Sequence, residues 1–73
     1  MELKEKLKEL RKEKEYTQSQ VAEMLKMSKT GYASWEQGLS EPGTTAIKKL
    51  CQIYNITADE LLDMDEYLKT KKV

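Results

Sequence analysis

Five residues between positions 29 and 37 have the types and the spacing to form one polar face of a helix. Their offsets of 0, 1, 4, 5 and 8 place them on a common side; they are Lys29, Thr30, Ala33, Ser34 and Gln37. Tyr32 and Trp35 lie three residues apart and turn to the opposite side. The face carries one cation and only small or polar side chains, because the carboxylate Glu36 lies off it.

A face of this kind has the chemistry needed to contact base edges in a major groove about 12 Å wide. Lys donates to guanine, Gln pairs with adenine, Ser and Thr donate or accept, and Ala contacts a thymine methyl group. The simpler interpretation is that these side chains only face water. The face alone leaves both interpretations open.

The segment that carries this face is bounded by helix-ending signals. Ser28 is a good N-cap and Gly38 a good C-terminal residue, so we expect a helix over 29–37. Thr17 and Gln20 form a capping-box pattern that begins a helix over 18–25. Two short helices joined by three or four residues are a helix-turn-helix candidate.

The rest of the chain also predicts helices. A leucine stripe in a Lys- and Glu-rich segment predicts a helix over 2–15, and the spacing of apolar residues predicts another over 44–54 that ends at Asn55. A second capping-box pattern, Thr57 with Glu60, begins a fifth helix. No segment is typical of a strand, so the predicted fold class is all-α.

Composition favours a binding function over catalysis. The 73 residues include no His and a single cysteine, Cys51, so we expect no metal site, no cofactor and no internal disulfide. No nucleophile lies beside a base in the pattern of an enzyme, and Cys51 has apolar neighbours typical of core packing. We find neither a signal peptide nor a long apolar run, and expect a cytoplasmic protein without membrane association.

Charge counts against a nucleic-acid partner. The 13 basic and 13 acidic residues give a formal net charge of zero, whereas a strongly basic balance is the usual signature of such a protein.

Several strings in order resemble the phage-repressor and Cro (Xre-type) helix-turn-helix family. They are Leu10-Arg11, the run 17–22, the run 28–38 that ends in Trp35-Glu36-Gln37-Gly38, then Pro42, and the run 59–62. The resemblance implies a five-helix lambda-repressor-like DNA-binding domain, which we assign to residues 1–68, with a polar tail at 69–73. It also implies double-stranded DNA as the partner.

The resemblance assigns expected roles to matching positions. Lys29, Thr30 and Ser34 match positions that reach base edges, with Ala33 and Gln37 beside them. Gln18 matches a position that contacts phosphate, and from their charge or hydroxyl groups we expect Lys26, Ser28, Ser40 and Thr44 to contact phosphate as well. Arg11 and Glu36 match a pair that forms a structural ion pair in the family. The loop after the third helix departs from the basic pattern of the family, because it carries Glu41 and no cation.

The expected function is a transcriptional repressor that binds a short palindromic operator as a homodimer, from a bacterium, phage or prophage. We expect the dimer interface to involve Met64, Tyr67 and Leu68, although these residues could instead complete the core. Two alternatives remain open: an antitoxin that binds a toxin, and a protein-interaction module that does not bind DNA.

Overall fold

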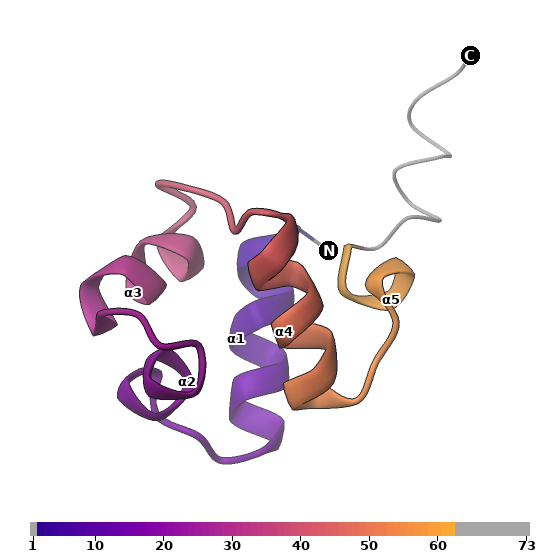
Figure 1. The fold of residues 1–73 in the computed structure, drawn as a ribbon, viewed down its shortest axis with the longest axis horizontal. Coiled ribbons are helices and arrows are strands. Elements are labelled where there is room, and N and C mark those ends of the chain that lie inside the picture. The colour runs from indigo at the N-terminus through magenta and orange to yellow at the C-terminus, as the bar shows by residue number, and fades with distance from the viewer. Residues whose placement is uncertain (1, 63–73) are drawn as a thin grey trace.

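The computed structural model describes residues 2–62, and all regular structure in that range is helical. The helices are α1 (Leu3–Glu13), α2 (Gln18–Met24), α3 (Lys29–Gln37), α4 (Thr44–Tyr54) and α5 (Ala58–Leu62). In Figure 1, α2 and α3 lie on one side of α1 and α5 lies on the other. The predicted all-α fold is confirmed, whereas Met64, Tyr67, Leu68 and the tail 69–73 lie outside the described residues.

One apolar core holds the five helices together. Each helix contributes at least one buried side chain to it, and the buried apolar residues are Leu7, Leu10, Val21, Ala22, Leu25, Tyr32, Leu50, Tyr54 and Leu61. The leucine stripe of α1 supplies two of them, as expected for an amphipathic helix that turns its apolar side inward. The expected contact of Cys51 with this core is also present, although Cys51 is only half-buried.

Side-chain caps determine where α2 and α3 begin. The Thr17 hydroxyl accepts a hydrogen bond from the Gln20 N–H at 3.1 Å, and the Gln20 side chain accepts from the Thr17 N–H at 2.8 Å. The Ser28 hydroxyl accepts from the Gly31 N–H at 3.0 Å. Gly38 ends α3 in the left-handed region with φ of +78°. The predicted bounds of α3 are therefore confirmed.

Three helix ends, belonging to two helices, differ from the prediction. The first helix was expected over 2–15, but Glu2 is its N-cap and it ends at Glu13, because Glu15 adopts φ of +59°. The second was expected to reach Leu25 but ends one residue earlier, and Lys26 adopts φ of +57°. Both turns place an ordinary side chain in the left-handed region, where a glycine would have marked the turn in the sequence.

Within residues 2–62, the helices are all too short and too polar to cross a membrane.

Candidate nucleic-acid interface

The structure places the five residues of the polar face on the outer side of α3. Lys29, Thr30 and Gln37 are exposed, whereas Ala33 and Ser34 are half-buried. We call these five residues the α3 face. The opposite side of the helix faces the core through Tyr32, which is fully buried, so the predicted division of α3 into two sides is present.

Trp35 packs less deeply than a core anchor would. Its ring meets that of Tyr32 edge-on, with centroids 5.9 Å apart and an interplanar angle of 67°. The side chain is half-buried and lies against the edge of the core. Trp35 therefore packs against the side of Tyr32 at the boundary of the core.

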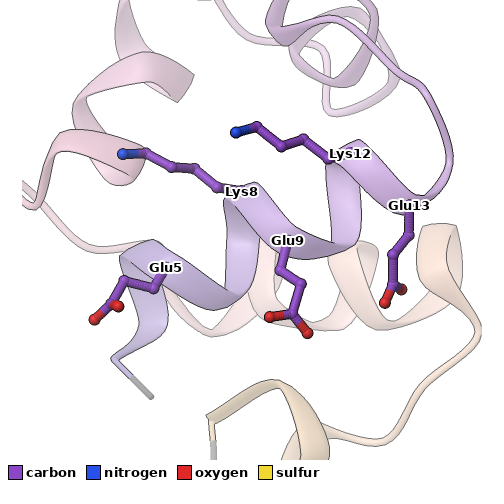
Figure 2. A pocket seen from close by; sticks show the side chains of 5 residues that line it. All are labelled: Glu5, Lys8, Glu9, Lys12 and Glu13. Atoms are coloured by element: carbon purple, nitrogen blue, oxygen red, sulfur yellow. The ribbon is translucent and has the colours of Figure 1, made fainter.

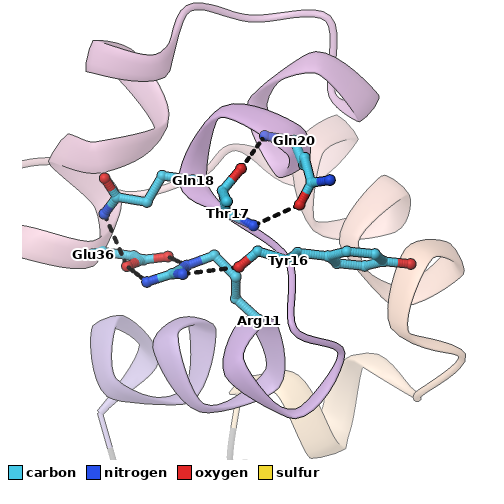
Figure 3. A network of polar contacts seen from close by, with 6 residues as sticks. All are labelled: Arg11, Tyr16, Thr17, Gln18, Gln20 and Glu36. Atoms are coloured by element: carbon cyan, nitrogen blue, oxygen red, sulfur yellow. Dashed lines mark hydrogen bonds and ion pairs between the residues drawn. The ribbon is translucent and has the colours of Figure 1, made fainter.

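Arg11 and Glu36 connect α1 to α3 through a bidentate ion pair (Figure 3). The Arg11 Nε donates to Glu36 Oε2 at 2.8 Å, and a second guanidinium nitrogen donates to Oε1 at 3.0 Å. The third nitrogen donates to the Tyr16 carbonyl at 3.0 Å. Paired contacts of this kind fix orientation as well as distance, so the rotation of α3 relative to α1 is constrained.

Gln18 extends this network to α2. Its side-chain nitrogen donates to Glu36 Oε1 at 3.1 Å. The resemblance predicted only a phosphate contact for Gln18, and nothing in the sequence indicated its hydrogen bond with Glu36. Gln18 is half-buried at the first turn of α2. This bond uses one N–H of its side-chain amide, and the other N–H and the carbonyl oxygen can still bind another group.

The network keeps Glu36 ionised although it is only 1% exposed. Burial alone would raise the pKa of Glu36, but hydrogen bonding, above all from Arg11, and the positive charge of Arg11 outweigh burial and hold that pKa below its ordinary value. The same hydrogen bond raises the pKa of Arg11. Both side chains are therefore charged, and their ion pair holds α1 and α3 together.

Two tyrosine hydroxyls lie buried near this ion pair. Within the described part of the chain, neither the Tyr32 nor the Tyr54 hydroxyl has a hydrogen-bond partner. Burial raises the pKa of Tyr32 well above its ordinary value and that of Tyr54 to about 12. Both phenols are thus neutral and serve packing.

The remaining expected phosphate contacts lie near the two ends of α3. Lys26 and Ser28 are exposed in the turn before it, and Ser40 and Thr44 are exposed in and after the loop that follows. Ser28 accepts the helix-capping bond through its oxygen, which leaves its proton free for an anion. Ser40 differs, because its hydroxyl lies 2.6 Å from that of Ser34.

The outer side of α1 carries separated charges (Figure 2). Lys8 and Lys12 extend toward the side of α2 and α3, while Glu5, Glu9 and Glu13 extend the other way. We call these the lysine row and the glutamate row. All five side chains are exposed around an open hollow, which has the character of a solvated surface.

Residues 2–62 contain no group of three or more His, Cys, Asp or Glu placed to hold a metal ion. Burial raises the pKa of the Cys51 thiol, so the reactive thiolate is disfavoured.

Comparisons with known proteins support the same architecture. A family model described as helix-turn-helix matches residues 7–61. The HTH-type transcriptional activator BcrR of Enterococcus faecalis is 40% identical over 93% of this chain and 33% of its own length. The HTH-type transcriptional regulator ImmR of Bacillus subtilis is 36% identical over 94% of this chain and 54% of its own. The cryptic phage CTXphi transcriptional repressor RstR of Vibrio cholerae is 31% identical over 90% and 64%.

A crystal structure of a transcriptional regulator from Listeria innocua superposes with a TM-score of 0.81 at 26% identity, covering 85% of this chain and 58% of that one. This chain thus spans between one third and two thirds of the length of these relatives. The family match covers most of the chain and includes both helices of the pair and the turn between them. The chain belongs to the Xre-type helix-turn-helix family.

Proposed function

We propose that the chain binds specific DNA sequences through the α3 face and thereby regulates transcription. The observation that carries this proposal is the division of α3 into two sides: the polar face is open while Tyr32 and Glu36 are buried. A major groove admits one α-helix, and a helix so anchored presents its outer side chains in a fixed register.

The groups around α3 provide the two kinds of contact that such binding needs. Lys29, Thr30 and Gln37 offer long or polar side chains to base edges. Lys26 and Ser28 at one end, and Thr44 at the other, are exposed where the phosphate backbone would flank the helix. Gln18 retains hydrogen-bonding capacity at the α2 N-terminus, where free N–H groups attract anions.

We further propose a homodimeric repressor that occupies a roughly palindromic operator in the bacterial cytoplasm. Two copies related by a twofold axis would place their α3 helices about 34 Å apart, on successive major grooves. The name of RstR as a phage repressor supports repression, whereas that of BcrR as an activator supports the opposite outcome. Sedimentation equilibrium at micromolar concentrations tests the dimer, and a monomer throughout that range would contradict it for the free protein.

Selection of bound sites from a random duplex library tests DNA binding directly. We expect one short motif to be enriched, and a mobility shift to show preference for it over random DNA. Lys29→Ala should weaken binding to that motif by about 1–3 kcal/mol if Lys29 contacts a base. Lys49→Ala, which removes an exposed lysine of α4 outside the proposed surface, is the matched control and should change affinity little.

The two alternatives make different predictions in this test. Zero net charge is the observation that favours a protein-interaction module without DNA binding, and no enriched motif would support it. An antitoxin would bind DNA and also form a stable complex with a toxin, so co-purification with the product of a neighbouring gene would favour that role.

A further inference from the structure

The hydroxyl of Ser34 has its single proton committed within the protein. Its oxygen lies 2.6 Å from the Gly31 carbonyl oxygen, which can only accept, so Ser34 donates to Gly31. The same oxygen lies 2.6 Å from the Ser40 hydroxyl oxygen. Because the Ser34 proton is already used, Ser40 must be the donor in this second bond. The two bonds run in one direction, from Ser40 to Ser34 to Gly31.

The loop backbone holds the two serines together. The carbonyl oxygen of Ser34 accepts hydrogen bonds from the Leu39 N–H at 2.9 Å and from the Ser40 N–H at 3.4 Å. Gly38 makes this turn possible with its positive φ. The position of Ser40 relative to α3 is therefore set by backbone contacts in addition to the hydroxyl pair.

Neither hydroxyl then has a proton to offer outward. What remains are oxygen lone pairs, one on Ser34 and two on Ser40, and Ser40 is exposed beside the α3 face. Guanine N7 and O6, thymine O4 and phosphate oxygens are all acceptors, so none of them can pair with this corner. In the major groove, the donors among the bases are the exocyclic amino groups of adenine and cytosine.

We propose that Ser34 and Ser40 form an acceptor-only corner of the DNA-binding surface, which selects a base with an exocyclic amino group. This inference rests on the proposed function and assigns a specificity to part of the same surface. It gives Ser40 a base contact in place of the phosphate contact expected from the sequence, because a phosphate contact would require the proton that Ser40 donates to Ser34.

Leu39 favours adenine as that base. Its side chain is 76% exposed, and Leu39 directly precedes Ser40 in the turn that its N–H closes onto the Ser34 carbonyl. The thymine paired with adenine carries a methyl group in the major groove, whereas the guanine paired with cytosine offers only acceptors there. Burial of Leu39 against a methyl group is favourable, so an A·T pair satisfies both the apolar side chain and the hydroxyl pair.

Base analogues in the selected motif test this proposal. At each adenine, a purine nucleotide that lacks the 6-amino group is substituted; at each cytosine, a 2-pyrimidinone that lacks the 4-amino group. We expect loss of one amino group to weaken binding of the unmodified protein roughly tenfold. An adenine position with this effect, together with a loss when its thymine is replaced by uracil, identifies A·T; a cytosine position identifies the other source.

The protein variants assign that effect to the two serines. In the double variant Ser34→Ala with Ser40→Ala, the penalty at that position should fall from about tenfold to within about twofold. Ser40→Thr keeps a hydroxyl and is the matched control, which should retain the penalty. Circular dichroism and thermal unfolding of each variant verify that the fold is intact.

Two results would overturn the inference. One is a double variant that still shows the full amino-group penalty at every position, because other residues then recognise those bases. The other is a motif at which no amino-group removal weakens binding. If no motif is enriched from the library at all, the proposed function fails, and this inference fails with it.

Discussion

At the scale of single residues, the buried charge of Glu36 connects three helices. A lone carboxylate in such a position would take up a proton, since burial disfavours the charged form. Three hydrogen bonds, two from Arg11 and one from Gln18, keep it ionised and connect α1, α2 and α3 at one point. The cost of desolvation is offset only while all partners are in place.

The depressed pKa of Glu36 predicts a loss of stability in acid. Ionised Glu36 contributes its full stabilisation above the unfolded-state pKa, near 4.5, and loses it as the pH falls through the lower folded-state pKa. Urea unfolding measured between pH 7 and pH 3 should show this decline. Glu36→Gln removes the titrating group and should flatten that part of the profile; an unchanged profile would contradict the assignment.

Removing Arg11 should destabilise the fold strongly. Arg11→Met leaves Glu36 buried without its charged partner, and we expect a decrease of about 3 kcal/mol in the free energy of unfolding. That is a large share of the roughly 4–11 kcal/mol typical of a domain of this size. Lys12→Met, on the exposed side of the same helix, is the control and should change stability by less than about 0.5 kcal/mol.

At the scale of elements, the turn between α2 and α3 sets how the two helices meet. The Lys26 N–H donates to the Glu23 carbonyl at 3.0 Å and the Met27 N–H to the Ala22 carbonyl at 2.9 Å, which closes the end of α2. The turn requires φ of +57° at Lys26, a conformation that costs an ordinary residue about 1–2 kcal/mol. A lysine at this position therefore strains the turn.

A pair of substitutions at Lys26 separates strain from charge. Lys26→Gly should raise the free energy of unfolding by about 0.5–1 kcal/mol relative to Lys26→Ala, because glycine adopts positive φ without steric cost. Both variants remove the same charge, so both should weaken DNA binding equally if Lys26 contacts phosphate. Chemical denaturation and a binding titration measure the two effects, and equal stabilities would show that the turn is not strained.

The helix ends that could be predicted from sequence are those at which the residue type itself favours the position. Ser28 and Gly38 bound α3 and Asn55 ends α4 with φ of +53°, because each residue type has a local preference for that position. The turns at Glu15 and Lys26 were missed because neither residue type favours the left-handed region, where a glycine would have marked the turn. Spacing alone revealed neither the Gln18 contact with Glu36 nor the hydroxyl pair of Ser34 and Ser40, because only the folded chain brings those side chains together.

At the scale of the whole molecule, few cations lie near the proposed DNA surface, and this limits the dependence of binding on salt. Lys26, Lys29 and one more cation per copy would neutralise about 4–6 phosphate charges in a dimer and give a slope of log affinity against log salt of about −4 to −5. Binding titrations on the selected motif between 50 and 300 mM salt measure it. A slope steeper than about −8 would show that many more cations take part.

The lysine row and the glutamate row on α1 should affect how the protein is oriented when it approaches a polyanion such as DNA. The formal net charge is zero, so a polyanion exerts little net attraction at long range, but it attracts the lysine row and repels the glutamate row once they lie within a Debye length of about 8 Å. The flank with Lys8 and Lys12, on the side of α2 and α3, would then turn inward first. We expect this orientation to favour a first contact on the side of α2 and α3 and, because the net charge is zero, weak retention on arbitrary DNA sequence.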